Sequence, residues 1–245
     1  MRRLACILAT LLLTAGCATV PEDARVDYDP LEGLNRGIYG INDALDRVLT
    51  KPIARGYQKI VPEPARKGVT NFSNNLFTPR SALNNFLQGK PREGFGELSR
   101  FLLNSTFGLA GLVDVAAASG IEANTEDFGQ TIAVWGAPSG PYLMLPFRGP
   151  TTLRDVVVMP LDIQADPLYH YENTSVRDKL YVLRLINLRA RLLTLDELLA
   201  DSADPYVTVR ESYLQNREFE IFDGNPPADE EEDDLFDEFF DDEEY

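Results

Sequence analysis

Apolar side chains recur at helical spacing along most of this chain, and that spacing restricts its fold more than any other feature. The first stripe, within residues 29–49, consists of Leu31, Leu34, Ile38, Ile41, Leu45, Val48 and Leu49. Four later stretches repeat the pattern: 78–89, 92–106, 175–192 and 204–217. Alternating residues, which indicate strands, are confined to short pieces near Ile132–Trp135 and Tyr142–Leu145. The sequence therefore predicts a mainly α-helical protein with a single helical domain.

Proline and capping residues divide this pattern into separate helices. Asp29 is a predicted N-cap, with Pro30 at the first helical position and Glu32 completing a capping box. Pro52 is expected to end or kink this first helix, because proline lacks the N–H that a helix interior uses. Thr78-Pro79 is expected to open the next helix.

The first sixteen residues have the features of an export signal. Arg2 and Arg3 precede an apolar run from Leu4 to Leu13, and small residues then lead to Cys17. The run is shorter than the roughly 20 residues that a membrane-spanning helix needs. A cysteine directly after Ala-Gly predicts a lipoprotein, in which the signal peptide 1–16 is removed and Cys17 is acylated. Residues 17–28 then form the acylated N-terminus and a short tether.

An ordinary signal peptide with an incidental cysteine is the alternative. The only other cysteine, Cys6, lies in the removed segment, so Cys17 would be an unpaired thiol in an oxidising compartment. Acylation accounts for that thiol. Thr14 departs from the Leu that is usual three residues before the cysteine. Ala18, rather than Asp, is typical of sorting to the outer membrane, so we expect lipid anchoring at the periplasmic leaflet of the cell outer membrane.

Composition removes most catalytic chemistry. His170 is the only histidine, which excludes a zinc site with several His or Cys ligands and leaves Ser-His-Asp catalysis without support. Ser139 lacks the spacing of a nucleophile elbow, and a hydrolase built on Ser139 and His170 is the weakest alternative. No phosphate-binding loop ends in Gly-Lys-Ser/Thr. We therefore expect no catalytic residue, no metal, no cofactor and no enzymatic activity.

The acidic charge belongs to the C-terminal tail. The formal net charge is −16, and residues 225–245 contribute −12 of it, since they hold twelve Asp or Glu and no Lys or Arg. We expect residues 223–245 to be disordered and no nucleic acid to be bound. A solvated tail is one interpretation. A partner-binding helix is the other, because four apolar residues share helical spacing: Leu235, Phe236, Phe239 and Phe240.

Two apolar segments are unusual for a helical protein in water. Residues 107–120 are small and apolar, and residues 136–150 hold three Gly and four Pro around an apolar centre. Connecting loops normally run over the surface and are polar. Residues 136–150 are therefore either packed in the interior or face lipid or a cavity for an apolar ligand.

Five sequence blocks occur in a characteristic order: "DPLEGLNRGIYGIND" (29–43), "NNFLQGKPREG" (84–94), "RFLLNSTFGLAGLVDVA" (100–116), "EDFGQTIAVWGAPSGPYLMLPFRGPTTLRD" (126–155) and "DPYVTVRESYLQNR" (204–217). Together they resemble the MlaA, or VacJ, family of outer-membrane lipoproteins over about residues 29–218. The chain has Ile41-Asn42 where members often have Phe-Asn, and its tail is longer and more acidic than the family pattern.

The resemblance implies a ring of amphipathic helices sunk into the outer membrane around a central amphipathic channel, formed by residues 29–222. It implies removal of mislocalised phospholipid from the outer leaflet and its transfer to a soluble periplasmic lipid carrier protein, which maintains lipid asymmetry. It also implies association with a trimeric porin. The alternative is a non-transporting adaptor lipoprotein that binds porins or other envelope proteins.

Candidate site residues follow from chemistry and position. The candidate lipid path consists of Tyr142, Leu143, Met144, Leu145, Phe147 and Arg148. Guanidinium groups match phosphate geometry, so the candidate head-group contacts are Arg177, Arg184, Arg189 and Arg191. Each of these arginines is otherwise a solvated or salt-bridged surface residue. Residues 31–49 and 101–118 are candidate segments lying in the membrane, and a helical core is their alternative.

Overall fold

The computed structural model describes residues 29–227. The predicted signal peptide, the Cys17 anchor, the tether before Asp29 and residues 228–245 of the tail lie outside the described residues. The helical segments are α2 (Glu32–Leu45), η2 (Asp46–Thr50), α3 (Lys51–Ile60), α4 (Glu63–Leu87), α5 (Pro91–Thr106), α6 (Val115–Ala118), α7 (Phe128–Val134), α8 (Leu153–Gln164), η3 (Pro167–His170), α9 (Thr174–Leu192), η4 (Leu193–Leu195), α10 (Asp196–Asp201) and α11 (Pro205–Ile221). The strands are β1 (Tyr142–Leu145) and β2 (Gly149–Thr152).

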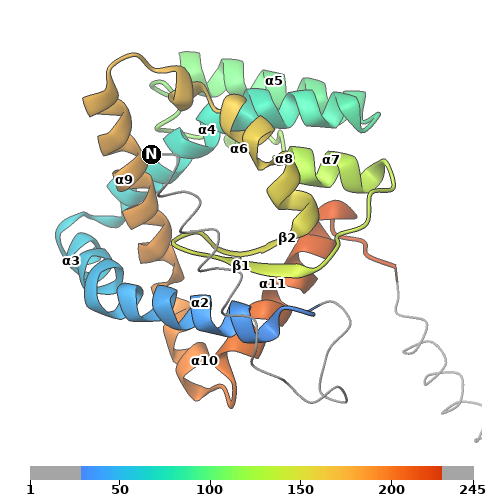
Figure 1. The fold of residues 1–245 in the computed structure, drawn as a ribbon. Coiled ribbons are helices and arrows are strands. Elements are labelled where there is room, and N and C mark those ends of the chain that lie inside the picture. Colours follow the sequence, from blue (N-terminus) through green and yellow to red (C-terminus); the bar gives the residue numbers. More distant parts are fainter. Residues whose placement is uncertain (1–28, 228–245) are drawn as a thin grey trace, which may run out of the picture.

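The helices form a ring, as Figure 1 shows: α4 and α5 lie on one side, α9 and α3 on a second, α7 and α8 on a third. The hairpin of β1 and β2 lies along the fourth side, next to α2 and α11. The predicted mainly helical domain and its ring arrangement are confirmed. The paired segments α4–α5 and α3–α9 pack directly against each other.

Three local predictions were wrong. Asp29 does not cap α2, whose N-cap is Leu31, because the buried Asp29 carboxylate is used by α11 instead. Pro79 does not open a helix but lies inside α4, which begins sixteen residues earlier, at Glu63. Residues 132–135 belong to the end of α7 rather than to a strand. Pro52 has the predicted effect on the first helix, because the π-helical turn η2 separates α2 from α3 immediately before it.

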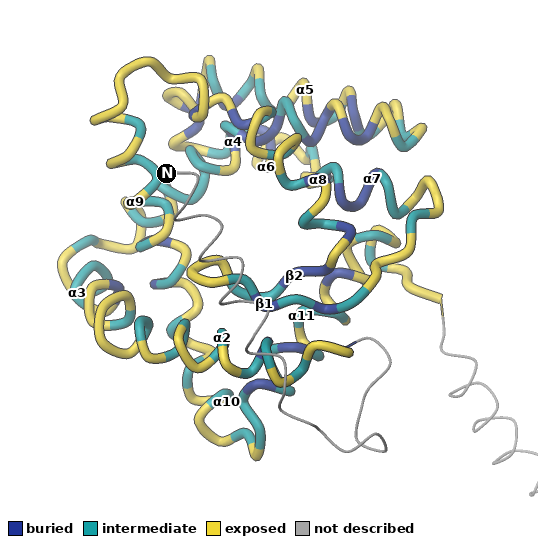
Figure 2. The backbone as a smooth tube through the Cα atoms, in the orientation of Figure 1, coloured by how far each residue is buried: buried dark blue, intermediate teal, exposed yellow. Residues whose placement is uncertain are grey.

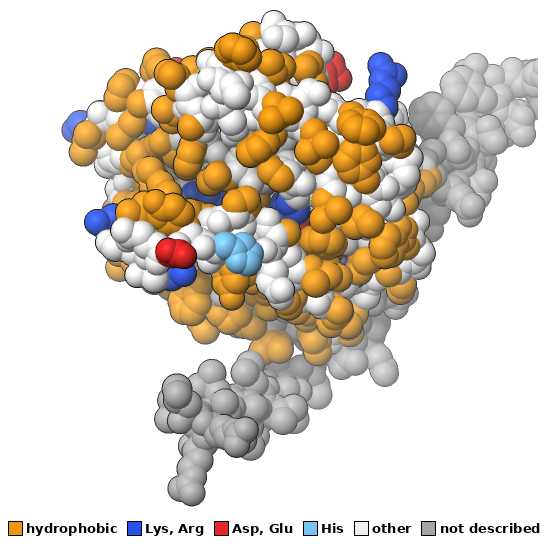
Figure 3. Space-filling model, turned by 90° about the horizontal axis from the view of Figure 1, so that it is seen from above, with side chains coloured by type: hydrophobic (Ala, Val, Ile, Leu, Met, Phe, Trp, Pro, Cys, Tyr) orange, Lys and Arg blue, Asp and Glu red, His pale blue; other side chains and the backbone are white. Residues whose placement is uncertain are grey.

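The interior of the ring wall is polar and its surface is apolar. Among residues 29–227, 20 buried side chains are polar or charged and 10 are apolar. Exposed segments cover most of the outer helices in Figure 2, and hydrophobic side chains cover most of the face in Figure 3. Water-soluble domains bury their apolar residues preferentially. The apolar stripes that predicted the helices therefore point largely outward.

The segments 31–49 and 101–118 illustrate this arrangement. Val48 is 80% exposed and Phe107 is 74% exposed, whereas the buried residues of α2 and of the end of α5 are Asn35 and Asn104. Leu102, on α5, is 61% exposed. An exposed apolar stripe opposite a buried asparagine fits an apolar surrounding better than a core helix. No helix within residues 29–227 is long and apolar enough to cross a membrane.

Buried polar groups hold neighbouring helices together by hydrogen bonds. On α4, Asn84 accepts a 2.7 Å hydrogen bond from the hydroxyl of Thr131 in α7, and Asn85 donates to the carbonyl of Asn124 at 3.0 Å. Glu126 is 1% exposed and accepts from Lys90 at 3.0 Å. These bonds satisfy groups whose burial would otherwise be costly. The ring wall thus depends on specific polar contacts more than on apolar packing.

Helix α11 joins the two ends of the ring. Arg210 donates a 2.9 Å hydrogen bond to Asp29, which also accepts from the hydroxyl of Tyr206 at 2.6 Å. Further along α11, Arg217 donates to Asp127 before α7 at 2.8 Å and to Asp155 in α8 at 2.9 Å. Charge-assisted bonds of this kind are among the strongest in proteins. The start of α2 and the α7–α8 side are therefore both fixed to one helix.

Candidate functional site

The segment 136–150 contains a β-hairpin rather than an irregular loop. Strand β1 pairs antiparallel with β2, with Tyr142 opposite Thr152 and Leu145 opposite Gly149. The turn places Phe147 at φ 62° and Gly149 at φ 95°. A positive φ is unfavourable for an aromatic residue, so contacts with other elements are needed to hold the turn in this conformation.

Two asparagines of α2 attach the hairpin to the ring. Asn35 donates to the carbonyl of Tyr142 at 3.1 Å and accepts from the N–H of Met144 at 2.9 Å. Two helical turns later, Asn42 donates to the carbonyl of Leu145 at 2.9 Å and accepts from the N–H of Phe147 at 2.8 Å. Each amide thus replaces the backbone of a third strand, which fixes the hairpin against α2.

Replacing Asn35 with Leu should destabilise the protein. The Leu side chain cannot form the three buried hydrogen bonds of Asn35. These are the bonds to the carbonyl of Tyr142, to the N–H of Met144 and, at 2.8 Å, to Asp29. We expect the free energy of unfolding to fall by about 2–4 kcal/mol, measured by urea unfolding in nonionic detergent. The exposed Asn216, on α11, is the matched control, and Asn216→Leu should change stability by less than about 0.5 kcal/mol. A small effect of Asn35→Leu would contradict the role of Asn35.

A cavity of about 770 Å³ lies between α2, the hairpin, α10 and α11. Met144, Phe147 and Arg148 of the candidate lipid path line it. Its wall also contains apolar and polar groups of other elements, including Tyr39, Asn42, Leu192, Leu199, Val209 and Ser212. A volume in the range of about 300–1,000 Å³ is typical of ligand sites. The mixture of apolar and polar groups suits an amphipathic ligand.

The remaining candidate path residues lie elsewhere on the hairpin. Tyr142 is fully buried, with its ring edge-on to Tyr206 and Tyr213 at centroid distances of 6.3 and 6.2 Å. Leu143 and Leu145 are half-buried and, by strand alternation, lie on the opposite face from Met144. Tyr142 therefore shares a strand face with Met144, packs against α11 and does not line the cavity.

The four candidate head-group arginines have different surroundings. Arg189 is held by Asp46 at 2.7 Å and by Asp196 at 2.8 Å, so it links η2 to α9 and α10 at the cavity wall. Arg177 pairs with its neighbour Asp178 at 3.1 Å, and Arg191 is exposed. Arg184 is half-buried and lies 3.8 Å from Asp166. Burial lowers the pKa of the Arg184 guanidinium, and the charges of Arg80 and Arg148 lower it further.

Sequence reasoning did not select Asn35, Asn42 or Arg80. The two asparagines are seven residues apart, which is two helical turns, on the side of α2 opposite the exposed Ile41 and Val48. The polar residues at helical spacing were the sequence signal that could have identified this buried side of α2. Arg80 follows Pro79 in a segment that was interpreted as a helix start rather than as a helix interior.

No arrangement for hydrolysis is seen among residues 29–227. The His170 ring nitrogen Nε2 bonds to the carbonyl of Gln164 at 2.7 Å, and Ser139 is exposed on the segment before β1. Within the described part of the chain, no group of three or more His, Cys, Asp or Glu could hold a metal ion.

A ring of helices with a polar interior, an apolar surface and an amphipathic cavity defines a class of membrane-associated lipid-handling protein. A family model for the MlaA lipoprotein matches residues 27–220. The chain belongs to the MlaA lipoprotein family.

Several relatives have been named. The chain is 39% identical to the intermembrane phospholipid transport system lipoprotein MlaA of Shigella flexneri, covering 89% of this chain and 88% of the relative. It is 38% identical to the protein of the same name in Escherichia coli strain K12, with the same coverage. A solved structure described as "Structural basis for maintenance of bacterial outer membrane lipid asymmetry" matches with a TM-score of 0.70 and 38% identity, covering 80% of this chain and 99% of that one.

Proposed function

We propose that this chain is an outer-membrane lipoprotein of an intermembrane phospholipid transport system. It removes mislocalised phospholipid from the outer leaflet and passes it to a soluble periplasmic lipid carrier protein. The observation that carries the proposal is the combination of the apolar surface with the 770 Å³ amphipathic cavity in a polar-walled ring. The printed names of the relatives, and the lipid asymmetry named for the similar structure, support the same function.

The polar-walled ring acts by lowering the free-energy barrier to the passage of a phospholipid head group through the bilayer. A phospholipid crosses a bilayer slowly because its charged head group must leave water, and charged groups cost at least about 2.5–3.5 kcal/mol at the membrane centre. A polar wall offers the head group hydrogen bonds while the chains stay in lipid or against apolar side chains. Such a path changes rate and not direction, since it cannot shift an equilibrium between leaflets. Removal of lipid by the carrier therefore supplies the direction.

The residues divide into three roles within this proposal. Met144, Phe147 and Arg148 line the lipid path, while Tyr142, buried beside Met144, packs the hairpin against α11. The segments 31–49 and 101–118 lie in the membrane, for which their exposed apolar residues are the support. Acylated Cys17 anchors the chain at the periplasmic leaflet, and three acyl chains make such an anchor effectively permanent. A trimeric porin is the proposed partner within the membrane.

Replacing residues 136–150 with a polar linker should abolish transport. The linker removes Met144, Phe147 and Arg148 from the cavity wall and the partners of Asn35 and Asn42 from α2. Surface phospholipid is measured by labelling amine head groups on whole cells with a membrane-impermeant reagent. We expect a deletion strain to show raised labelling, which the wild-type gene restores and the linker variant does not.

The control is the location and folding of the linker variant, checked by membrane fractionation and protease resistance. If the deletion leaves surface phospholipid unchanged, the transport proposal fails and the adaptor function becomes the one to test. If the linker variant restores normal labelling, transport does not pass along the hairpin.

A further inference from the structure

Two arginines from different sides of the ring share one aromatic residue. The guanidinium carbon of Arg184, on α9, lies 3.9 Å from the ring centroid of Phe77, and that of Arg80, on α4, lies 5.0 Å from it. Phe77 is only 9% exposed. Cations over an aromatic face are stabilised by the ring, which allows the two positive charges to stay close together.

The nearby carboxylates neutralise this pair incompletely. Arg80 lies 3.2 Å from Asp162, and Arg184 lies 3.8 Å from Asp166. Asp166 already accepts hydrogen bonds from the N–H of Leu168 at 2.9 Å and from the hydroxyl of Tyr181 at 3.1 Å. Asp162 also accepts a hydrogen bond from the N–H of Phe128 at 3.3 Å, so its carboxylate is shared with α7.

Both guanidinium groups have unused hydrogen-bond donors. The carboxylate that pairs with Arg184 is 3.8 Å away, beyond hydrogen-bond distance, and no hydrogen bond of its guanidinium is seen among residues 29–227. The buried Nε of Arg80 donates no hydrogen bond within the same residues. The pKa of the Arg184 guanidinium is lowered by burial and further by the charges of Arg80 and Arg148. Two neighbouring guanidinium groups with unused donors form a site that favours an anion.

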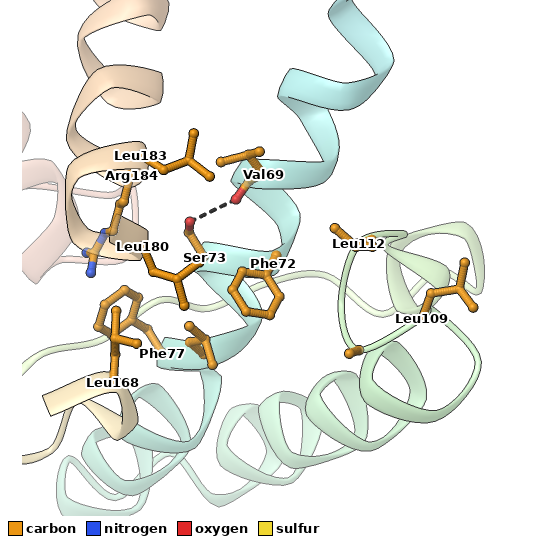
Figure 4. A pocket seen from close by; sticks show the side chains of 12 residues that line it. Val69, Phe72, Ser73, Phe77, Leu109, Leu112, Leu168, Leu180, Leu183 and Arg184 are labelled. Carbon is orange, nitrogen blue, oxygen red and sulfur yellow. Dashed lines mark hydrogen bonds between the residues drawn. The ribbon is translucent and has the colours of Figure 1, made fainter. Parts of the chain in front are cut away.

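An apolar cavity of about 270 Å³ continues from this cluster. Its lining includes Phe77 and Arg184 themselves, together with Phe72, Leu76, Leu180 and Leu183. Figure 4 shows the apolar side chains of α4 and α9 pointing towards one another, with the nitrogens of Arg184 at their edge. The hydroxyl of Ser73 in its wall is satisfied by the carbonyl of Val69 at 2.8 Å. The volume is just below the range of about 300–1,000 Å³ for drug-sized ligands, so it suits a chain segment and not a whole lipid.

Apolar space that ends at a cluster of guanidinium groups has the polarity of a phospholipid. We propose that Arg80 and Arg184 bind the phosphate of a glycerophospholipid whose acyl chain enters the cavity between α4 and α9. This holding site rests on the proposed transport function and adds a defined resting place on the path. Bidentate guanidinium bonds to the phosphate oxygens hold the head group, and the cavity selects for a long chain.

Binding to the purified full-length mature lipoprotein in nonionic detergent tests the site by native mass spectrometry. The probes are dioleoylphosphatidylethanolamine and dioleoylglycerol, which share their chains and differ in the phosphate. We expect the phospholipid to bind and Arg184→Gln to weaken it at least tenfold, since a bond to a charged group is lost. Arg80→Gln should weaken it several-fold, with folding checked by circular dichroism. Lys179→Gln, at an exposed position on the same helix as Arg184, is the matched control.

The other outcomes separate the site from the transport proposal. Wild-type affinity in both Arg184→Gln and Arg80→Gln excludes the phosphate contact, and equal losses with dioleoylglycerol exclude it too. If millimolar inorganic phosphate competes as effectively as the lipid itself, binding of the acyl chain in the cavity is excluded. If the protein binds lipid but surface phospholipid is unchanged in the deletion strain, the transport proposal fails and the site remains. If transport is normal and both variants bind lipid like the wild type, this site fails and the transport proposal remains.

Discussion

Replacing Arg217 with Met is expected to lower the free energy of unfolding by about 3–5 kcal/mol, because it removes one partner of a buried ion-pair network. Arg217 is 8% exposed and donates to Asp127, Asp155 and Glu220. The substitution would leave the Asp127 carboxylate without its ion-pair partner, and Asp155 with Arg154 at 3.2 Å and the hydroxyl of Tyr213 at 3.0 Å. Urea unfolding in nonionic detergent, followed by far-ultraviolet circular dichroism, measures the loss.

The effect should depend on pH in a defined direction. Burial alone would raise the pKa of Asp155, but attraction to Arg217 and its hydrogen bond outweigh burial and lower the pKa. A lowered folded-state pKa contributes stability above the unfolded value of about 3.9, and that contribution is lost as the pH falls through the folded-state pKa. The difference in free energy of unfolding between wild type and Arg217→Met should therefore be smaller at pH 3 than at pH 7.

Arg177→Met is the matched control for this network, because Arg177 pairs only with its exposed neighbour Asp178 among the contacts of residues 29–227. It should change stability by less than about 0.5 kcal/mol. An Arg217→Met protein within about 1 kcal/mol of wild type would show that α11 does not hold the ring closed.

Placing aspartate on the outer face of α5 should release the chain from membranes. Leu102 is 61% exposed and Phe107 is 74% exposed, and both lie in a segment proposed to contact lipid. A charge that reaches hydrocarbon costs about 2.5–3.5 kcal/mol, so Leu102→Asp with Phe107→Asp should reduce binding well over tenfold. A chain that starts at residue 18, without the acyl anchor, is tested by flotation with phosphatidylcholine vesicles.

Gln215→Asp, at an exposed polar position of α11, is the control for this experiment and should float like the wild-type chain. Neutral vesicles remove any general repulsion between added aspartate and anionic lipid. Equal flotation of the double variant and the wild type would show that 101–118 faces water. The adaptor function would then gain support over membrane insertion.

The sequence was sufficient for the helices but not for the direction in which they face. Apolar spacing located α5 and α11, and the helical period of residues 31–49 was correct. Period alone does not say whether a stripe such as Ile41 and Val48 contacts protein or lipid, because both surroundings are apolar. The distinction required the burial of Asn35 and Asn104 on the opposite sides of the same helices.

The candidate site was located in part. Residues 136–150 were identified from their Gly, Pro and apolar composition, and Phe147 and Arg148 do line a cavity. The short alternating piece Tyr142–Leu145 is β1, whose Tyr142 packs against α11 instead of lining the cavity. Arg189 was a reasonable phosphate contact by residue type, yet Asp46, 143 positions away, pairs with it. Such long-range pairs depend on the ring and cannot be inferred from local sequence.

The bond between Asp29 and Arg210 joins positions 181 residues apart. The last helix therefore adds a second closure to a ring that Asn35 and Asn42 already join by holding the hairpin against α2. Until α11 is made, the Asp29 carboxylate lacks Tyr206 and Arg210, and Asp127 lacks Arg217. A chain truncated before residue 205 would leave both carboxylates without these partners.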